Sequence, residues 1–361
     1  MRTIVSVTTR PVRIELDKPV GSMLGQIASF GCILVFVRCD DGSVGENLVF
    51  TLNDRRTKVL RQMVDELAEL VIGRDAGHIA DFWSRAWKDI NFVGHTGIPV
   101  MAISAIDGAL WDALGKSLGV PLYRLLGGAR ASIPVYHSGG MWLTLTEAEL
   151  VAEAEQFAAS GFKAMKMRLG SPDPMLDVTR VRAVRKAIGP TVALMADANQ
   201  GLTAPSAIRL GRLLEEFNLA WFEEPLPAWD LRGSADVAAA LDTPIASGET
   251  EYTRYGFRRM IELGSADVLM PDLQRVGGVS EFICVGQMAR SYDLPVSSHL
   301  FPEASIHLLC ALSNATYLEY MPWFSKLYNE ALVMKDGCAH VPERPGWGFS
   351  FNLEYLKHLE N

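Results

Sequence analysis

The chain has 361 residues, 49% of them hydrophobic, a length that exceeds one small domain and accommodates a large barrel with an accessory domain. Its formal net charge of −8 at pH 7 argues against a nucleic-acid partner. No continuous apolar run reaches the roughly 18 residues that a membrane span needs, so we expect no membrane partner either.

The N-terminal part of the chain reads as an α+β block. MRTIVSVTTRPVRIEL alternates apolar and polar residues like a strand and lacks the continuous apolar stretch of a signal peptide. ILVFVRCDDGSVGENLVF places two apolar runs around an Asp-Asp-Gly turn signal. Two helical patterns follow, TKVLRQMVDELAELVIG and MAISAIDGALWDALGKSLG. The block ends near PLYRLLGG, so we place its boundary at residue 125.

From residue 126 to residue 325, strand and helix patterns alternate. Helical patterns such as TEAELVAEAEQFAAS and DVTRVRAVRKAIG separate most of the strands, which predicts a parallel sheet with right-handed crossovers. Eight units predict closure into a barrel. The expected strands are 134–138, 164–168, 192–197, 219–223, 245–249, 268–272, 296–299 and 317–319. The Gly/Pro-rich segment 326–361 is expected to fold back on the N-terminal block.

Three acidic residues stand at even spacing, each at the end of an apolar run. Asp197 closes TVALMAD, Glu223 closes LAWFE and Glu249 closes TPIASGE, so both intervals are 26 residues. One strand-plus-helix unit of a (β/α)₈ barrel takes about 30 residues. Three consecutive strands would therefore deliver three carboxylates to one rim, an all-oxygen site suited to a hard cation such as Mg²⁺.

The same register continues along the chain. Asp272 ends ADVLMPD, His299 ends LPVSSH and Glu319 follows TYL. Catalytic groups of such barrels lie at the C-terminal ends of the strands. Asp272 and His299 close adjacent expected strands, and a carboxylate beside an imidazole fixes its tautomer and favours its protonated form. The two residues are therefore a candidate acid/base dyad.

Two cations stand on an earlier expected strand. Lys166 and Arg168, in KAMKMRLG, are two residues apart, so the alternation of a strand puts both on one face. If that face is the barrel interior, both lie beside the three carboxylates; the alternative is a pair of solvated charges. Asp197 and Asn199 have the same spacing, so Asn199 can also face the ligand.

These residues resemble those of the enolase superfamily, in the mandelate racemase/muconate lactonizing enzyme family and its mandelate racemase subgroup. The resemblance covers nearly the whole chain and rests on KMR, MADANQ, WFEEP, SGE, MPDLQRVGG and SSHLF. It implies an α+β capping domain (1–125), a modified (β/α)₇β barrel (126–325) and a C-terminal segment (326–361) that packs on the cap. FNLAWFEEPL, DTPIASGE and WFSKLYNEALVMKDG also look like parts of the galactarate and talarate dehydratases.

The resemblance implies a role for each candidate residue. One Mg²⁺ per subunit would bind the substrate carboxylate, and its ligands would be Asp197, Glu223 and Glu249. The Asp272–His299 dyad would serve as acid/base on one face of the substrate, and Glu319 would support the developing enolate. The polar positions on the substrate side would be Ser138, Asn199 and Lys166, with the lysine on the substrate carboxylate.

Arg168 departs from the family's pattern. Many members carry Lys-x-Lys with an acid/base lysine at the second position, which here is an arginine. A guanidinium stays protonated in nearly any setting, so it is a poor general base but a good donor to a carboxylate or hydroxyl. The second face of the substrate therefore lacks a normal base, which weakens the case for two-base racemisation.

The function that follows is a Mg²⁺-dependent enzyme. His299 would take the α-proton of a carboxylate, and Lys166, Mg²⁺ and, if protonated, Glu319 would stabilise the enediolate. With one base, we favour loss of a β-hydroxyl, in which a dehydratase converts a sugar acid to a 2-keto acid. The alternative is a racemase or epimerase of a 2-hydroxy acid. A third hypothesis is a metal-binding barrel that has lost activity through the lysine-to-arginine change.

The substrate lid is expected, by the same resemblance, from PVGSMLGQIASFG and NLVFTLN in the N-terminal block. The candidate specificity residues are Met23, Leu24, Ile27, Phe50 and Leu52, each of which is equally interpretable as core of the cap. Their apolar character fits poorly with a fully polar sugar diacid and suits a shorter, deoxy or aromatic hydroxy acid.

The five cysteines form no CxxC pair, and their number is odd. Free thiols in a reducing compartment are the simplest account, so we expect a cytoplasmic protein. A small-molecule carboxylate is the expected ligand. The family resemblance adds a homo-oligomer, with an octamer as one expected form.

Overall fold

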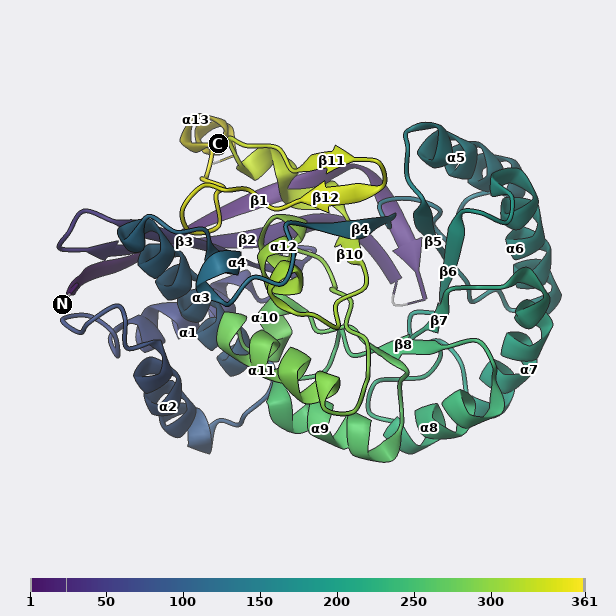
Figure 1. Ribbon diagram of the computed structural model, residues 1–361, viewed down its shortest axis with the longest axis horizontal. Helices are drawn as coiled ribbons and strands as arrows, with labels where there is room; N and C mark the ends of the chain where they lie inside the picture. The colour runs from purple at the N-terminus through teal and green to yellow at the C-terminus, as the bar shows by residue number, and fades with distance from the viewer. Residues whose placement is uncertain (1, 24, 360–361) are drawn as a thin grey trace.

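The computed structural model describes residues 2–23 and 25–359 and shows a cap packed against a barrel (Figure 1). The cap sheet is antiparallel in the order β1-β2-β3, and α1 and α3 share a buried core with it. The predicted Asp-Asp-Gly turn joins β2 to β3, and its Gly42 has a φ of 87°. The elements of the cap are β1 (Ile4–Ser22), β2 (Gly25–Cys39), β3 (Val44–Leu52), α1 (Thr57–Ala68), α2 (Ile79–Asp89), η1 (Ile90–Phe92), α3 (Ile98–Leu118) and α4 (Leu122–Leu125).

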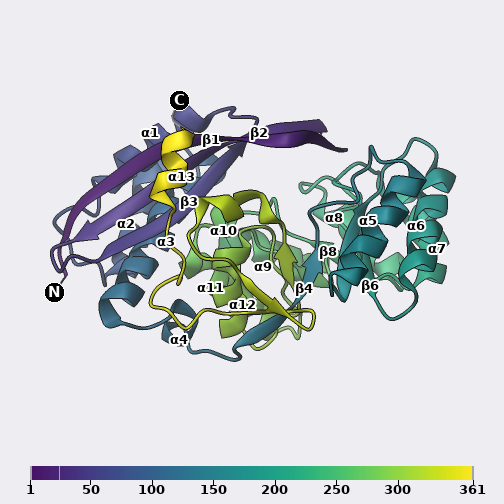
Figure 2. The ribbon, with the colours of Figure 1, turned by 90° about the horizontal axis from the view of Figure 1, so that it is seen from above.

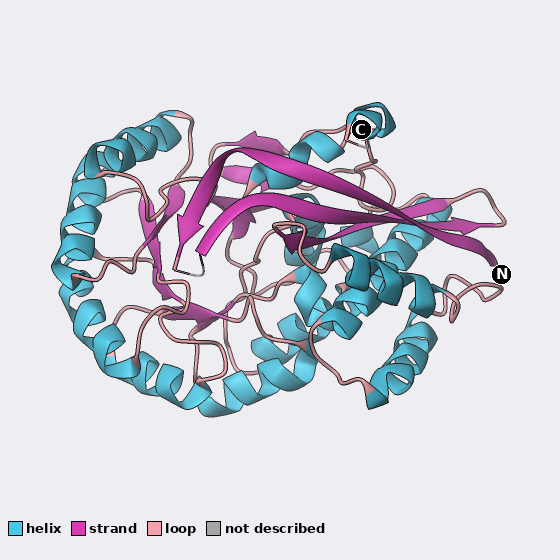
Figure 3. Ribbon diagram, turned by 180° about the vertical axis from the view of Figure 1, so that it is seen from behind, coloured by secondary structure: helices cyan, strands magenta, loops and turns pink. Residues whose placement is uncertain are grey.

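Strands β1 and β2 form a long arm that reaches from the cap over the barrel (Figures 2 and 3). The two strands pair from Ile4↔Cys39 to Ser22↔Gly25. At the tip of the arm, Met23 lies so close to Gly170 and Gly201 that a side chain at either glycine would collide with it. The arm therefore brings cap residues to the barrel face that carries the expected catalytic groups.

Helix α3 is the central helix of the cap. It is long and apolar enough to cross a membrane by length and composition, but 72% of its apolar window is buried inside the protein. Asp112 on this helix pairs with Lys116 at 2.6 Å and accepts the backbone N–H groups of Glu46 and Trp347, both at 2.8 Å. These contacts make α3 a core helix that ties the cap sheet to the C-terminal segment.

The barrel strands run parallel in the order β4-β5-β6-β7-β8-β9, and β10 pairs in parallel with β4 to close the ring. Helices α5 to α9 form an outer wall around it (Figure 1). The strands are β4 (Ser132–His137), β5 (Ala164–Arg168), β6 (Ala193–Asp197), β7 (Trp221–Glu223), β8 (Ile245–Ser247), β9 (Val268–Leu269) and β10 (Leu318–Tyr320). The helices are α5 (Glu147–Ala159), α6 (Pro174–Ile188), α7 (Ala204–Leu214), η2 (Glu215–Phe217), α8 (Leu231–Ala240), α9 (Thr253–Leu263), α10 (Leu273–Val276), α11 (Val279–Arg290) and α12 (Pro302–Ala311). The predicted modified (β/α)₇β fold class is confirmed.

The seventh barrel strand, expected at 296–299, is not a regular strand. It consists of isolated bridges at its two ends, Val296 and His299. Between them, the backbone N–H groups of Ser297 and Ser298 still donate to the carbonyls of Leu269 and Tyr317, at 2.9 and 3.3 Å. The two hydroxyl groups add bonds of their own: Ser297 donates to the Tyr317 carbonyl at 2.9 Å, and Ser298 accepts the N–H of Glu319 at 3.2 Å. Strand β9 is also shorter than the expected 268–272, because Pro271 offers no N–H to a ladder.

The C-terminal segment contacts both the cap and the barrel. Its strand β12 pairs antiparallel with β4. The Trp347 indole donates to the carbonyl of Glu46 in the cap at 3.0 Å, and the rings of Phe351 and Phe36 meet edge-on at 5.6 Å. The boundaries at residues 125 and 325 stay predictions. The elements of this segment are η3 (Pro322–Leu327), β11 (Val333–Lys335), β12 (Cys338–His340) and α13 (Leu353–His358).

A buried histidine joins the end of the cap to the C-terminal segment. The Nδ1 atom of His307, on α12, accepts the N–H of Tyr123 at 3.2 Å. Its Nε2 lies 2.6 Å from the carbonyl oxygen of Trp347, so the proton of this ring sits on Nε2. Burial lowers the pKa of His307 to about 4. The junction therefore depends on a neutral imidazole.

Candidate active site

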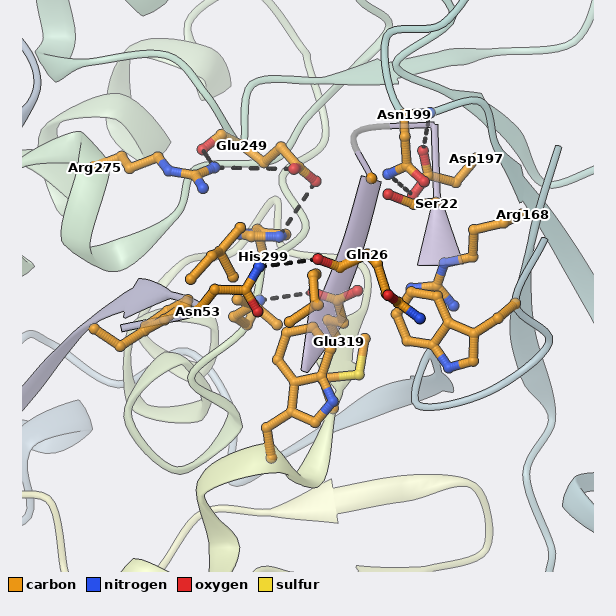
Figure 4. A pocket seen from close by; sticks show the side chains of 18 of the residues that line it. Ser22, Gln26, Asn53, Arg168, Asp197, Asn199, Glu249, Arg275, His299 and Glu319 are labelled. Atoms are coloured by element: carbon orange, nitrogen blue, oxygen red, sulfur yellow. Dashed lines mark hydrogen bonds and ion pairs between the residues drawn. The ribbon is translucent and has the colours of Figure 1, made fainter. Parts of the chain in front are cut away.

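A cavity of about 280 Å³ lies between the barrel and the cap (Figure 4). The barrel side is lined by the predicted site residues Lys166, Arg168, Asp197, Asn199, Glu249, His299 and Glu319. The cap side includes Gln26, Ile27, Phe50, Leu52, Asn53, Arg55 and Arg56. Residues predicted from widely separated motifs therefore meet in one pocket.

The three expected metal ligands stand at the ends of three neighbouring strands. Asp197 and Glu223 are the last residues of β6 and β7 and pair with each other in register. Glu249 follows the end of β8. Their exposed fractions are 1%, 0% and 8%, so all three carboxylates are buried. A buried carboxylate is stable only when it is paired with a positive group or bound to a metal, so these three depend on the cations around them.

Lys166 is the cation at the centre of the carboxylates. Its ammonium group lies 3.1 Å from Glu319 and 3.5 Å from Asp197, and it also pairs with Glu223. Burial lowers the pKa of this lysine, but the three carboxylates outweigh burial and raise it. Lys166 is therefore a fixed positive charge on the pocket floor, on the predicted face of β5.

The donor set suits a hard cation by its chemistry. Among the described residues, no three His, Cys, Asp or Glu side chains are arranged to hold a metal ion. The expected ligands form ion pairs with basic side chains instead. Glu249, for example, lies 3.3 Å from His299 and 3.9 Å from Arg275. Burial and the neighbouring acids raise the pKa of Glu223 to about 8, although Lys166 opposes the rise. This surplus of carboxylates is what a divalent cation would neutralise, once the side chains turn toward one another.

The predicted dyad is formed. The Nδ1 atom of His299 lies 2.7 Å from Asp272 Oδ2, while Asp272 Oδ1 accepts the N–H groups of Gln274 and Arg275 at the start of α10. The carboxylate is thus fixed by the helix, and it directs Nε2 of His299 toward Glu249. Burial lowers the pKa of His299, but the charge of Glu249 and the bond to Asp272 raise it to about 9. A cation at Glu249 would oppose this rise.

Glu319 is held as a carboxylate. Besides its pair with Lys166, it accepts the N–H of Leu300 at 2.7 Å. Leu300 and Phe301 have φ values of 52° and 49°, a left-handed backbone that non-glycine residues adopt only when their surroundings enforce it. Burial raises the pKa of Glu319, but Lys166 and His299 outweigh it and lower it to about 2. The support of an enolate by a protonated Glu319 stays a prediction.

Arg168 lines the pocket, but its guanidinium is bound to the loop after β4. Its Nη1 donates to the carbonyls of Ser138 and Gly140 at 2.6 and 2.8 Å, and its Nη2 donates to Ser138 Oγ at 2.8 Å. The guanidinium also lies 4.0 Å from the centre of the Trp142 ring. Its Nε has no hydrogen-bond partner among the described residues. Arg168 thus holds the loop and the tryptophan beside the cavity.

Asn199 and Ser138, the two remaining candidates for polar contact with a substrate, differ in their position relative to the cavity. Asn199 lines the cavity, donates from Nδ2 to Asp197 at 3.0 Å, and its buried Oδ1 has no partner among the described residues. Ser138 does not line the cavity, and its hydroxyl accepts from Arg168. The structure therefore favours Asn199 over Ser138 as the residue that meets a ligand.

The predicted specificity residues are also divided. Ile27, Phe50 and Leu52 line the cavity, whereas Met23 lies against the barrel glycines at the tip of the arm. Leu24 lies outside the described residues. Phe50 is fixed at both backbone atoms, since Gln274 accepts its N–H at 2.7 Å and donates to its carbonyl at 3.1 Å. It also packs in a cluster of phenylalanine rings, so it belongs to the core and to the pocket wall.

Sequence reasoning missed the polar part of the cap wall. The cavity is also lined by Gln26, Asn53, Arg55 and Arg56, which follow or precede the apolar runs that defined the lid. Asn53 is visible as a turn signal in TLNDRR, but nothing in that pattern distinguishes two pocket arginines from solvated ones. The five predicted specificity residues are all apolar, so the polar share of the lid was not among them.

Comparison with known proteins identifies the family. Residues 4–127 match "Mandelate racemase / muconate lactonizing enzyme, N-terminal domain", and residues 149–355 match "Enolase C-terminal domain-like". The chain belongs to the mandelate racemase/muconate lactonizing enzyme family of the enolase superfamily. Together the two matches cover the cap, most of the barrel and most of the C-terminal segment, as the sequence motifs predicted.

Relatives of this family member include enzymes of two classes. It is 35% identical to 3,6-anhydro-alpha-L-galactonate cycloisomerase from Streptomyces coelicolor over 99% of each chain. It is 38% identical to L-talarate/galactarate dehydratase from Salmonella typhimurium over 80% of this chain and 72% of the relative. A racemase from Streptomyces coelicolor, crystallised with bound magnesium, superposes with a TM-score of 0.95 at 35% identity, over 99% of each chain.

Proposed function

We propose that this protein is a Mg²⁺-dependent hydro-lyase that dehydrates a sugar acid to a 2-keto acid. The observation that carries the proposal is the asymmetry of the pocket. His299, oriented by Asp272, is the one imidazole among the described residues that line it. Arg168, where the family pattern has a lysine, is bound to loop carbonyls.

The chain's own residues would divide the work as follows. Lys166 would hold the substrate carboxylate, since its charge is fixed on the pocket floor. His299 would accept the α-proton at Nε2, because Nδ1 is committed to Asp272. The same imidazolium could return that proton to a departing β-hydroxyl, so that water leaves and the enol product rearranges to a 2-keto acid. One base therefore suffices for dehydration.

Asp197, Glu223 and Glu249 would hold the metal. Bound Mg²⁺ would supply positive charge beside the substrate carboxylate, where negative charge grows as the α-proton leaves. A structural neighbour crystallised with bound magnesium supports the choice of metal. Glu223→Gln should abolish Mg²⁺ binding by calorimetry while the far-ultraviolet circular dichroism stays unchanged.

An isomerase is the second candidate. The cycloisomerase relative matches over the whole chain, and that class could use the same proton abstraction by His299 without losing water. The non-catalytic hypothesis has no such support, since the full-length relative is an enzyme.

The test is a screen of sugar acids and 2-hydroxy acids with purified protein and Mg²⁺. Mass spectrometry should show a product that has lost one water, and a carbonyl reagent should trap it as a 2-keto acid. A product of unchanged mass would favour the isomerase. No product and no α-proton exchange with any acid would contradict both.

A further inference from the structure

The cap wall of the pocket carries two arginines whose side chains have no partner in the part of the chain that the structure describes. Arg55 and Arg56 line the cavity and are exposed, and neither makes a hydrogen bond, ion pair or ring contact through its side chain. What distinguishes these two arginines from other exposed ones is that they line the cavity.

Every other cation of the pocket is matched by a group of the protein. Lys166 contacts three carboxylates, Arg275 pairs with Glu249, and Arg168 is bound to the loop after β4. The two arginines of the cap are therefore the positive charges of this pocket that no group of the protein neutralises within the described residues.

The loop that carries these arginines is built into the cap sheet. Asn53 accepts the N–H of Ala28 at 2.8 Å and donates to the carbonyl of Gln26 at 2.9 Å, which joins the loop to β2 (Figure 4). Asn53, Asp54 and Arg56 all have positive φ values, between 52° and 71°. Such a backbone persists only where other contacts fix it.

The acidic residue of the loop is directed elsewhere. Asp54 lies 3.9 Å from Arg13 and sits so close to Gly31 that a side chain there would collide with it. The loop thus turns its carboxylate toward β1 and β2, while Arg55 and Arg56 reach the cavity. The arrangement separates the charges instead of pairing them within the loop.

We propose that Arg55 and Arg56 form a subsite for a second anion at the far end of the substrate. The inference rests on the proposed function for the reacting end, where Lys166 and the Mg²⁺ that Asp197, Glu223 and Glu249 would hold would bind the first carboxylate. The substrate class is then an acid sugar with anions at both ends, either an aldarate or an aldonate phosphorylated at its last carbon. An aldonate with a terminal alcohol would leave both guanidinium groups without a partner.

The test compares acids that differ only at the far end. Galactarate and galactonate form one such pair, glucarate and gluconate another, and galactonate 6-phosphate distinguishes phosphate from carboxylate. Dissociation constants are measured by calorimetry on Mg²⁺-loaded protein, in a His299→Asn background so that no turnover interferes. In wild-type protein, KM provides a second measurement for any acid that reacts.

In at least one of the two sugar series, galacto or gluco, we expect the doubly anionic acid to bind about 10-fold or more tightly than the paired aldonate, which carries one anion. Arg55→Gln/Arg56→Gln should remove that preference and leave monoanion binding within about 2-fold. Lys58→Gln is the matched control, because Lys58 is an exposed cation of α1 that does not line the cavity.

Three outcomes would contradict the subsite. The first is equal affinity for the dianion and the monoanion in every pair. The second is an equal loss of affinity for both acids in the double variant, and the third is the same loss of affinity in Lys58→Gln. Tighter binding of the 6-phosphate, lost in the same variant, would identify the anion as phosphate and support the subsite. Exchange of the α-proton in D₂O is followed separately, so a failure of the proposed chemistry is distinguishable from a failure of the subsite.

Discussion

The two walls of the pocket hold their charges in different ways. On the barrel wall, Lys166, Asp272 and Glu319 are at most 1% exposed and are committed to one another or to the backbone. On the cap wall, Arg55 and Arg56 are exposed and unpaired among the described residues. A network in which every group is satisfied keeps its geometry, as proton transfer requires. The unpaired arginines of the cap leave their charge free to bind a substrate. Substitutions on the cap wall can therefore change which acid binds without disturbing the proton-transfer groups of the barrel wall.

The largest effect should come from the barrel wall. His299→Asn removes the imidazole that Asp272 orients, and we expect a loss of about 10³-fold in turnover. Asp272→Asn should cost less, about 10²-fold, because the amide can still cap α10 while the histidine loses its tuned orientation. Steady-state kinetics on any acid found active, with Lys58→Gln as a control from outside the pocket, measures both. Equal activity of His299→Asn and wild type would remove this residue as the base.

Arg168 belongs to neither wall pattern, because it lines the pocket while its guanidinium is bound to the loop after β4. Arg168→Met leaves two carbonyls and a buried hydroxyl without their donor, and we expect a loss of about 3 kcal/mol in unfolding free energy, measured by urea denaturation. KM should rise as Trp142 loses its support.

Arg180 provides the matched control. It donates to the carbonyls of Leu145 and Trp142, at 2.6 and 3.2 Å, but does not line the cavity. Arg180→Met removes one bond to the Trp142 backbone but leaves the Arg168 guanidinium over the Trp142 ring, so it should lose stability with a smaller change in KM than Arg168→Met. An equal KM effect in both variants would show that Arg168 has no particular relation to the pocket.

A milder effect should appear in the response of stability to pH. His307 is neutral in the folded protein, with a pKa of about 4, whereas an unfolded histidine has a pKa near 6.5. The unfolded chain binds more protons between these values, so stability falls as the pH falls through about 6.5 and stops falling on this account near 4. The slope from this residue approaches about 1.4 kcal/mol per pH unit.

His307→Gln tests this account, because a glutamine can make both hydrogen bonds without titrating. Its unfolding free energy, measured in urea from pH 7.5 to pH 5, should depend on pH less steeply than that of wild type. Parallel curves would show that His307 does not contribute.

The smallest effect should come from the tip of the arm. Met23 is 40% exposed and lies against glycines of the barrel, outside the cavity lining. Met23→Ala should change unfolding free energy by about 0.5 kcal/mol or less and KM by about 2-fold. A large change in the relative KM of two acids would restore Met23 as a specificity residue.

The barrel side of the site could be predicted because strand ends carry a regular signal. The spacing of Asp197, Glu223 and Glu249 follows from the repeat length of one barrel unit, and it depends on no side-chain rotamer. The direction of Arg168 could not be predicted, since the alternation of β5 gives a face but not whether the guanidinium reaches a ligand or a loop. The pairing of Glu319 with the Lys166 ammonium could not be predicted either, because it depends on the rotamers of two side chains from different strands.

The cap side was predicted least well. Its wall depends on positive φ values at Asn53, Asp54 and Arg56, which no apolar pattern reveals. The segment 296–299 was predicted as a regular strand, but its pairing is reduced to isolated bridges, which the apolar pattern of LPVSSH does not distinguish from a continuous ladder.

The most direct test of the central claim, one working base in the pocket, uses the two α-epimers of an acid that the protein accepts. Each epimer is incubated with Mg²⁺-loaded wild-type protein in D₂O, and the α-proton is followed by NMR. The account predicts that one epimer reacts through His299 and that the other retains its proton, since a bound guanidinium stands where a second base would be. Comparable exchange from both epimers would show two working bases and contradict the account.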